Sequence, residues 1–421
     1  MDKFVIKGGR SLNGTVKVSG AKNSALALMP SILLNDGVNT LENVPEVNDI
    51  FTMMKLLNQL GVITSFDGKT LSLDSSNITS QIAPYEHVKK MRASVYVLGP
   101  LLAKYGYAKV SMPGGCAWGP RPINLHLEAM KKFGASIELE EGYIITKANK
   151  LMGARINFDI SSVGATGNAL MAAVLAKGES IITNAASEPE ITQLAEYLKQ
   201  MGAKIEGIGS NILEIEGVDD LKPATITNIP DRIEAGTLLI AGAMTRGKIK
   251  LENINSRHLN LPLQKLEDSG VNLLFNNNII EMDASNLDVK NVDITTAIYP
   301  GFPTDMQAQW TTYMCVVPGS SKITDTIYLD RFKHIPELNR LGANIEILRN
   351  SAIVNGVEKL KGATVMSTDL RASASLVLAG LAAEGTTEVL RIYHIDRGYQ
   401  RIEEKLKFLG ADIERVNTQE Y

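Results

Sequence analysis

One of the two cysteines, Cys116, stands in the Gly- and Pro-rich stretch "PGGCAWGPRP" at residues 113–122. Arg121 follows it in the same stretch. A neighbouring cation lowers the pKa of a thiol, and an activated thiol can act as a nucleophile or a general acid. The stretch therefore predicts a loop with a reactive cysteine, while an incidental loop cysteine is the alternative that the residues leave open.

Two further charged residues stand where loops lead into helices. Asp305 lies in "IYPGFPTDMQAQ", where a carboxylate can cap a helix or take up a proton as a general base. Arg397 lies in "YHIDRGYQRIEEKL", where it can pair with Asp396 or clamp a phosphate or carboxylate. Cys315, in the apolar run "WTTYMCVVPG", is expected to pack in the core.

Cations recur at the starts of apolar helices. Four of six such helices begin with one, namely Lys22, Arg92, Arg232 and Arg371. A cation is disfavoured at a helix N-terminus by typically about 0.3–1 kcal/mol. The recurrence therefore indicates an anion site built from side chains and helix N-termini. Pairing with a neighbouring acid, as for Arg232 with Asp231 or Arg371 with Asp369, is the alternative.

These residues must be positioned by a unit that the chain repeats six times, about every 70 residues. Each copy reads as strand, apolar helix, strand, amphipathic helix and strand pair (βαβαββ). The amphipathic helices, such as "PEITQLAEYLKQMGA", should lie outside, and each ends at a glycine that suits a C-terminal cap with positive φ: Gly61, Gly134, Gly202, Gly270, Gly342 and Gly410. The apolar helices should be buried. We expect an α/β protein with helices inside and sheets outside, in two globular domains rather than a solenoid, whose repeats usually have about 20–45 residues.

Composition narrows the function classes. The net charge is −3, so nothing global attracts nucleic acid or an anionic membrane. The chain shows no apolar signal core and no apolar run long enough to span a bilayer. Two cysteines suit a reducing compartment, and we expect a cytoplasmic protein. Zinc-type Cys/His spacing and Gly-rich phosphate-binding motifs do not occur, so we expect no metal, no cofactor and no obligate protein partner.

Seven stretches in order resemble the enolpyruvyl transferase family, in the branch that uses UDP-N-acetylglucosamine: "SGAKNSAL", "PGGCAWGPRP", "SVGAT", "DRIEAGT", "YPGFPTDMQAQ", "DLRASASLVLAGL" and "IDRGYQRIEEKL". The resemblance covers about residues 5–415. It implies two inside-out α/β domains, 22–230 and 1–21 with 231–421, and an active site in the cleft between them. It also implies transfer of enolpyruvyl from phosphoenolpyruvate to the 3-hydroxyl of UDP-N-acetylglucosamine by addition and elimination, with release of phosphate, which is the first committed step of peptidoglycan synthesis.

The resemblance further implies a role for each site residue. Cys116 would ride on a lid, protonate the methylene carbon and react with fosfomycin, while Asp305 would take the proton from the 3-hydroxyl. Lys22, Arg121 and Arg397 would hold the phosphate and carboxylate of phosphoenolpyruvate. Together with the helix-start residues Arg232 and Arg371, the predicted substrate-binding residues are Asn23, Arg92, Arg121, Pro122, Ile123, Asn124, Leu125, Ile160, Ser161, Ser162, Val163 and Ile327.

The match also has departures and rivals. The family commonly has a smaller apolar residue in place of Trp118, Ala or Ser in place of Pro120, and Asp in place of Asn124. Ile160 and Ser161 replace a Lys-Val pair that some members have. The sister enzyme that uses shikimate 3-phosphate is disfavoured, because its Lys-Ser-x-Ser/Thr-x-Arg start and its Asn-Ala-Gly-Thr segment are missing. A non-catalytic, anion-binding repeat protein is the rival from another class, although it has no use for the thiol or the carboxylate.

Overall fold

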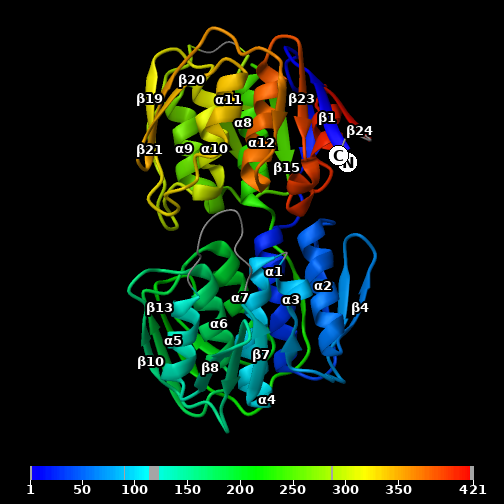
Figure 1. Ribbon diagram of the computed structural model, residues 1–421, viewed down its shortest axis with the longest axis vertical. Helices are drawn as coiled ribbons and strands as arrows, with labels where there is room; N and C mark the ends of the chain where they lie inside the picture. Colours follow the sequence, from blue (N-terminus) through cyan, green and yellow to red (C-terminus); the bar gives the residue numbers. More distant parts are fainter. Residues whose placement is uncertain (1, 90, 113–122, 286–287, 418–421) are drawn as a thin grey trace. The chain divides into compact units, whose positions relative to one another are not determined.

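A computed structural model describes residues 2–89, 91–112, 123–285 and 288–417 (Figure 1). The chain divides into two compact units. We call Gly20–Ile229 the inserted unit, and Met1–Ser19 with Pro230–Tyr421 the terminal unit. The resemblance had placed the boundaries after residues 21 and 230.

The inserted unit carries three copies of the repeat within its described residues. The first copy has α1 (Lys22–Ser31), η1 (Ile32–Leu34), β3 (Val38–Glu42), α2 (Asn48–Leu60), β4 (Ile63–Phe66) and β5 (Leu71–Asp74). The second has β6 (Ile82–Ala83), α3 (Tyr85–Val88), η2 (Arg92–Val97), α4 (Leu98–Tyr105), β7 (Tyr107–Ser111), α5 (Asn124–Lys132), β8 (Ser136–Glu140) and β9 (Tyr143–Lys147). The third has β10 (Arg155–Asn157), α6 (Val163–Ala173), β11 (Glu179–Thr183), α7 (Pro189–Gln200), β12 (Lys204–Glu206) and β13 (Ile212–Glu216), and β14 (Thr225–Thr227) follows it.

The terminal unit begins with β1 (Asp2–Lys7) and β2 (Asn13–Lys17) and resumes after β14 with three further copies. The fourth copy has α8 (Arg232–Met244), β15 (Lys248–Glu252), η3 (Ser256–Leu259), α9 (Asn260–Asp268), β16 (Asn272–Asn276) and β17 (Ile279–Asp283). The fifth has β18 (Ile294–Thr295), η4 (Thr304–Met306), α10 (Gln307–Met314), β19 (Ser320–Thr324), α11 (Ile335–Arg340), β20 (Asn344–Leu348) and β21 (Ser351–Asn355). The sixth has β22 (Thr364–Met366), α12 (Leu370–Ala382), β23 (Thr386–Leu390), η5 (Ile392–Arg397), α13 (Ile402–Phe408) and β24 (Asp412–Asn417).

The strands of the described residues form six four-stranded sheets, one for each copy. In β6-β7-β9-β8 the first pair is parallel and the remaining pairs are antiparallel. Two copies exchange their first strands, because β2 pairs with β15 of the fourth copy and β14 pairs with β3 of the first. The sixth sheet is completed by β1, which lies between β23 and β24. The chain thus changes unit directly after each exchanged strand.

The helices α8, α10 and α12 occupy the middle of the terminal unit, with strands around them (Figure 1). Every residue of α8 after Arg232 is buried, as is every residue of α10. Strand β13 alternates between buried Leu213 and Ile215 and exposed neighbours, so each sheet covers the core with one face. The predicted fold class, with helices inside and sheets outside, is therefore confirmed.

Helix α7 is more deeply buried than its amphipathic pattern predicts. Its polar side chains find partners inside the inserted unit: Gln193 accepts a hydrogen bond from Ser24, and the Tyr197 hydroxyl donates to Asn39 Oδ1 over 3.1 Å. Satisfied polar groups can be buried at little cost, whereas a pattern of residue types does not reveal their partners. The expectation that α7 lies outside is therefore wrong.

The six predicted cap glycines all have positive φ, between 87° and 108°. After α7, the Gly202 amide donates to Lys199 O over 3.0 Å, and the Ala203 amide donates to Leu198 O over 2.9 Å. This pair of hydrogen bonds is a Schellman motif. The prediction of glycine caps is confirmed.

Helix η2 gives way to α4 where a side chain enters the helical ladder. Asn168 of α6 accepts a hydrogen bond from the Gly99 amide over 2.8 Å and donates to the Val95 carbonyl over 2.9 Å. In an unbroken α-helix these two backbone groups would bond to each other. The inserted amide therefore separates a 3-10 start, which carries Arg92, from the α-helix that follows.

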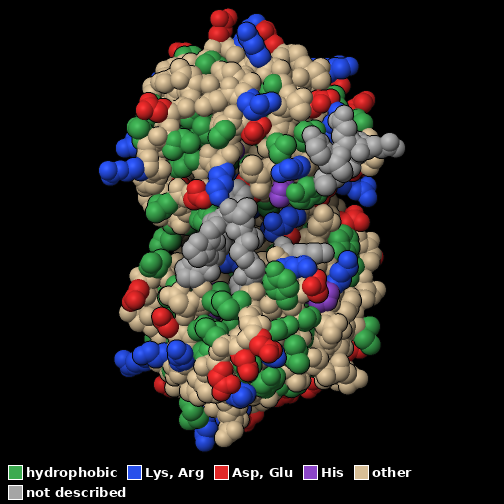
Figure 2. Space-filling model, in the orientation of Figure 1, with side chains coloured by type: hydrophobic (Ala, Val, Ile, Leu, Met, Phe, Trp, Pro, Cys, Tyr) green, Lys and Arg blue, Asp and Glu red, His purple; other side chains and the backbone are tan. Residues whose placement is uncertain are grey.

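Acidic and basic side chains are interspersed over the visible surface of each unit (Figure 2), in keeping with a net charge of −3. Among the helices of the described residues, none has the length and apolar character that crossing a membrane requires.

Candidate active site

The predicted site residues within the described ranges lie in or near the first turns of helices, or in the loops that precede them. The inserted unit holds Lys22, Asn23, Arg92, Ile123, Asn124, Leu125, Ile160, Ser161, Ser162 and Val163, and the terminal unit holds Arg232, Asp305, Ile327, Arg371 and Arg397. Cys116, Arg121 and Pro122 lie outside the described residues.

Lys22, the first residue of α1, is a buried cation. Its Nζ lies 3.1 Å from Oδ2 of Asp49, and the two side chains are 9% and 5% exposed. A buried ammonium is tolerated only when it is paired, so Asp49 in the first turn of α2 holds Lys22 in place. Asn23 follows on the exposed side of the helix start.

Two other helix starts of the inserted unit are tied together. The hydroxyl of Tyr96, in η2, donates to the Val163 carbonyl at the start of α6 over 3.3 Å. Ser162 caps α6 by accepting a hydrogen bond from the Ala165 amide. Arg92, the first residue of η2, is thereby placed close to the segment that begins α6.

The predicted acceptor-binding segments flank these starts. Ile123 is the N-cap of α5, and Asn124 is its exposed first residue. Ile160 is 71% exposed, and Ser161 is half-buried beside it. Exposed apolar side chains next to helix N-termini can contact a ligand that carries both a ring and phosphate groups.

His126 lies beneath this region as a neutral imidazole. It is buried, and its Nδ1 accepts a hydrogen bond from Asn168 over 2.8 Å. Asn168 can only donate there, because its oxygen already receives the Gly99 amide. Burial, helped by the Arg92 cation, lowers the pKa of His126 to about 3.

The free energy of unfolding should therefore fall in acid. His126 binds a proton below about pH 6.5 in the unfolded chain, whereas in the folded chain it stays neutral until the pH approaches about 3. The contribution is full above about pH 6.5 and is lost as the pH falls towards the folded pKa, by at most about 1.4 kcal/mol per pH unit. Urea unfolding between pH 7.5 and 5 should show a shallower loss in His126→Asn, whose amide oxygen can replace Nδ1 as acceptor. Equal slopes in both proteins would contradict the assignment.

In the terminal unit, Asp305 is held by two guanidinium groups. Arg331 Nη2 lies 2.7 Å from Oδ1, and Arg371 Nη2 lies 2.7 Å from Oδ2. The side chains of Asp305, Arg331 and Arg371 are 27%, 12% and 6% exposed, so the carboxylate is the most accessible member. The N-cap of η4 is Pro303, which has no side-chain acceptor, and the Asp305 oxygens bind the two arginines rather than the backbone of the helix start.

Arg371 is fixed by its surroundings. Burial alone would lower its pKa, but Asp305, Tyr399 and Asp231 outweigh burial, and the pKa of Arg371 is raised overall. Its guanidinium carbon lies 5.5 Å from the centre of the Tyr399 ring. Asp369, the predicted alternative partner, instead caps α12 by accepting the backbone amide of Arg371.

A buried polar cluster joins two of the central helices of the terminal unit, α8 and α10. Gln309 Nε2 lies 3.0 Å from the Asp305 carbonyl and 3.1 Å from both Thr237 Oγ1 and the Tyr399 hydroxyl. Thr237 and Tyr399 also bond to each other over 2.9 Å. The cluster links α8 and α10 to the segment after η5, and so fixes the backbone of Asp305.

A second acid, Asp325, ties Ile327 to the turn that carries Asp305. Its Oδ1 accepts the Ile327 amide over 2.9 Å, and its Oδ2 accepts the Thr304 hydroxyl over 2.7 Å. Asp325 is fully buried, and Ile327 is exposed. The Ile327 backbone is therefore held in a fixed relation to the catalytic candidate.

The two remaining arginines also lie near helix ends. The Arg232 guanidinium stands over the Tyr299 ring, 5.7 Å from its centre. Arg397 is the last residue of η5. The pKa of His394 is lowered mainly by burial and next by the positive charge of Arg397. Asp396, the predicted alternative partner of Arg397, forms a 2.6 Å ion pair with Arg415.

The structure thus brings Asp305 and Arg371 into direct contact and adds three residues that sequence reasoning missed. These are Asp49, Arg331 and Asp325. The sequence gives a weak signal for Asp49, because an acid in the first turn of a helix, here α2, interacts favourably with the helix dipole. Arg331 lies in "YLDRFKHIPEL", where nothing separates it from ordinary surface charge.

Cys315 packs in the core as predicted. It is fully buried, its Sγ donates to Thr311 O, and burial raises the pKa of its thiol to about 12. Among the described residues, no group of three His, Cys, Asp or Glu side chains is arranged to hold a metal ion.

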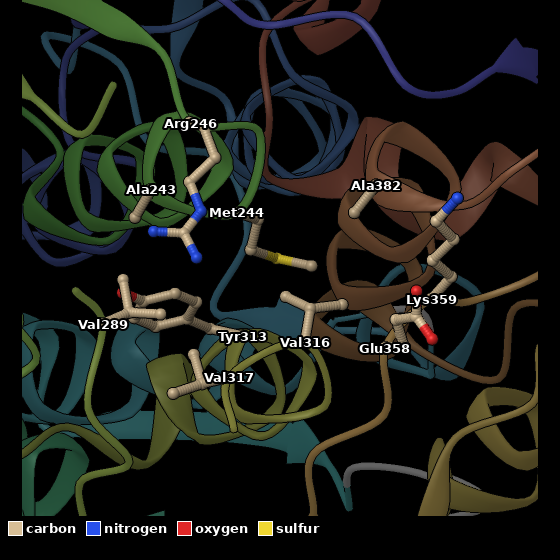
Figure 3. A pocket seen from close by; sticks show the side chains of 10 residues that line it. All are labelled: Ala243, Met244, Arg246, Val289, Tyr313, Val316, Val317, Glu358, Lys359 and Ala382. Carbon is tan, nitrogen blue, oxygen red and sulfur yellow. The ribbon is translucent and has the colours of Figure 1, made fainter. Parts of the chain in front are cut away.

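A cavity of about 190 Å³ lies elsewhere in the terminal unit. Figure 3 shows Met244 and the Arg246 guanidinium directed into it, with Tyr313 below and Lys359 across from them. Its walls come from the C-terminal ends of α8, α10 and α12. Since Arg232, Asp305 and Arg371 stand at the opposite ends of these helices, the cavity is separate from the candidate site.

Comparisons with known proteins show the family and the fold of this chain. Residues 6–406 match the family model of EPSP synthase (3-phosphoshikimate 1-carboxyvinyltransferase). UDP-N-acetylglucosamine 1-carboxyvinyltransferase from Chlorobium limicola is 56% identical over 424 residues and covers 100% of both chains. The protein of the same name from Chlorobium chlorochromatii is 55% identical over 430 residues, again with 100% coverage of both.

Solved structures share the fold. The enolpyruvyl transferase NikO from Streptomyces tendae superposes with a TM-score of 0.90 at 25% identity, covering 99% of each chain. EPSP synthase from Acinetobacter baumannii has a TM-score of 0.76 at 17% identity, over 99% of this chain and 100% of its own, which supports the fold alone. The chain therefore belongs to the EPSP synthase family of carboxyvinyltransferases and, within it, to the UDP-N-acetylglucosamine 1-carboxyvinyltransferases.

Proposed function

We propose that this enzyme transfers the enolpyruvyl group of phosphoenolpyruvate to the 3-hydroxyl of UDP-N-acetylglucosamine and releases phosphate. The observation that carries the proposal is the Asp305 carboxylate, held between Arg331 and Arg371 at the start of a buried helix. A fixed carboxylate beside cations suits a reaction that removes a proton from an alcohol next to an anionic donor. Full-length relatives with that printed activity supply the substrates.

In the addition step, Asp305 takes the proton of the 3-hydroxyl, and the sugar oxygen bonds to the central carbon of the donor. Cys116 gives a proton to the methylene carbon, which becomes a methyl group in a tetrahedral intermediate. In the elimination step, the Cys116 thiolate takes a proton back from the methyl group, the bond between the central carbon and the phosphate oxygen breaks, and the enol ether forms. The departing phosphate takes the proton that Asp305 holds. Each step conserves atoms and charge without an oxidant or reductant.

The anionic donor needs cations from several parts of the chain. We assign Lys22, Arg121 and Arg397 to its phosphate and carboxylate. Guanidinium groups suit these anions, because they donate several hydrogen bonds in one plane. Lys22 is supported by its placement, since Asp49 keeps it rigid at the start of α1. This proposal requires residues of both units to meet around one donor.

The UDP-sugar is assigned to Asn23, Arg92, residues 121–125, residues 160–163, Arg232, Asp305, Ile327 and Arg371. The links between Tyr96 and Val163, and between Asp325 and Ile327, support this assignment, because they fix backbone at the predicted contacts. We place the enzyme in the cytoplasm, at the first committed step of peptidoglycan synthesis, without a metal, a cofactor or an obligate protein partner.

A phosphate-release assay with separate acceptors tests the function. With phosphoenolpyruvate present, UDP-N-acetylglucosamine should support turnover, while shikimate 3-phosphate and buffer alone should not. Turnover only with shikimate 3-phosphate would favour the sister activity. Binding of both ligands without phosphate release would favour a non-catalytic anion-binding protein.

A further inference from the structure

His334 is a buried imidazole for which the proposed reaction has no role. It is 1% exposed and directly precedes α11 as its N-cap. Its Nδ1 lies 3.1 Å from the backbone carbonyl of Arg331. A carbonyl oxygen can only accept, so Nδ1 carries the proton and donates it to Arg331.

The other ring nitrogen identifies the state of the imidazole. Among the described residues, Nε2 is buried and has no hydrogen-bond partner. A bare acceptor nitrogen is tolerated there, whereas a proton on it would add an unpaired donor to a buried site. The ring is therefore neutral, and Nδ1 is its only donor.

His334 contacts the turn that carries Arg331, one of the two arginines that hold Asp305. This turn has no regular secondary structure of its own. The carboxylate of Asp369, which caps α12 just before Arg371, opposes the lowering of the His334 pKa by burial. Arg371 is already fixed by its helix and by Tyr399. Arg331 lies in a turn in which its own amide donates to Tyr328 O over 3.2 Å, and His334 adds a side-chain hydrogen bond to that turn.

We propose that His334 is a positioning residue for catalysis: its Nδ1–H fixes the Arg331 turn, so that the Arg331 guanidinium stays on Asp305. The proposal rests on the proposed role of Asp305 and goes beyond it. A carboxylate that loses one of its two guanidinium partners is held less firmly in the position that the reaction requires. Misplacement of a reacting group by about 1 Å can cost roughly 100-fold in rate.

A matched pair of variants isolates the Nδ1 donor. The side-chain amide of asparagine reaches the position of Nδ1, whereas the longer glutamine places its amide near Nε2. His334→Asn should therefore retain most of kcat, and His334→Gln should lower kcat by roughly 10- to 100-fold. KM for both substrates should change little in either variant, because the donor acts on the chemical step. Both variants lose the ring, so thermal unfolding serves as the control for packing.

The double variant with Arg331→Lys tests whether His334 acts through Arg331. His334→Gln should lower kcat by less than about threefold in that background, because coupled residues are not additive. Equal kcat losses in the asparagine and glutamine variants, or a full loss from His334→Gln in the Arg331→Lys protein, would overturn the proposal. Wild-type protein without turnover would instead refute the proposed function, so the two failures can be told apart.

Discussion

Asp305→Asn is expected to lower kcat by about 10²- to 10⁴-fold, the range that a general base contributes. Asparagine keeps the shape of the side chain but cannot take up the proton of the acceptor hydroxyl. The variant should also unfold more easily, by about 1–3 kcal/mol, because Arg371 is 6% exposed and would lose its charged partner. Steady-state phosphate release, measured well below the midpoint of thermal unfolding, gives kcat.

Asp283→Asn is the matched control. Asp283 lies in the same unit and pairs with Lys248 on the surface, where the two side chains are 46% and 58% exposed. The same chemical change there should leave kcat unchanged, since exposed pairs contribute little. Turnover of Asp305→Asn within threefold of wild type would show that Asp305 is not the base and would reassign it to holding the arginines.

Cys116→Ser is expected to abolish covalent labelling by the epoxide fosfomycin and to reduce turnover sharply. The chain has only two cysteines, and the other is inert, because Cys315 is fully buried with a pKa of about 12. Only a thiolate attacks an epoxide readily, and at pH 7.5 burial keeps Cys315 protonated. Intact-mass spectrometry should therefore find one adduct on wild-type protein and none on Cys116→Ser.

Cys315→Ser provides the counterpart. A serine hydroxyl can donate to Thr311 O as the thiol does, so the core loses little. This variant should still take up one adduct and retain its turnover. An adduct that persists in Cys116→Ser and disappears in Cys315→Ser would remove Cys116 from the mechanism.

The repeat architecture could be predicted because each copy marks its own boundaries. Gly202 and its five counterparts stand at caps that require positive φ, and the apolar helices lack a polar face. Both signals are local, since a few neighbouring residues determine them. Local patterns do not reveal the exchange of β2 and β14, because these short strands fit either sheet and only long-range pairing decides between them. The family resemblance implied it, through the domain boundaries after residues 21 and 230.

The candidate site was predictable in its members but not in its contacts. Asp305 and Arg371 are 66 residues apart, and the closest acid to Arg371 in sequence, Asp369, caps a helix instead. Arg331 joins the pair through a turn that carries no repeating signal. Sequence order favours the nearest partner of opposite charge, whereas the fold selects the partner that the helix starts bring together.

The strand exchange has a consequence for biosynthesis. All strands of the three inserted-unit sheets lie within Gly20–Ile229, so this half can complete its core while the ribosome is still translating the remainder. Strand β2 must wait for β15, and β1, with Phe4 and Ile6, must wait for β23 and β24. Strands β1 and β2 thus leave the exit tunnel before the inserted unit but find their neighbours only after it, and the nascent chain carries an unpaired apolar strand until β23 and β24 have been translated.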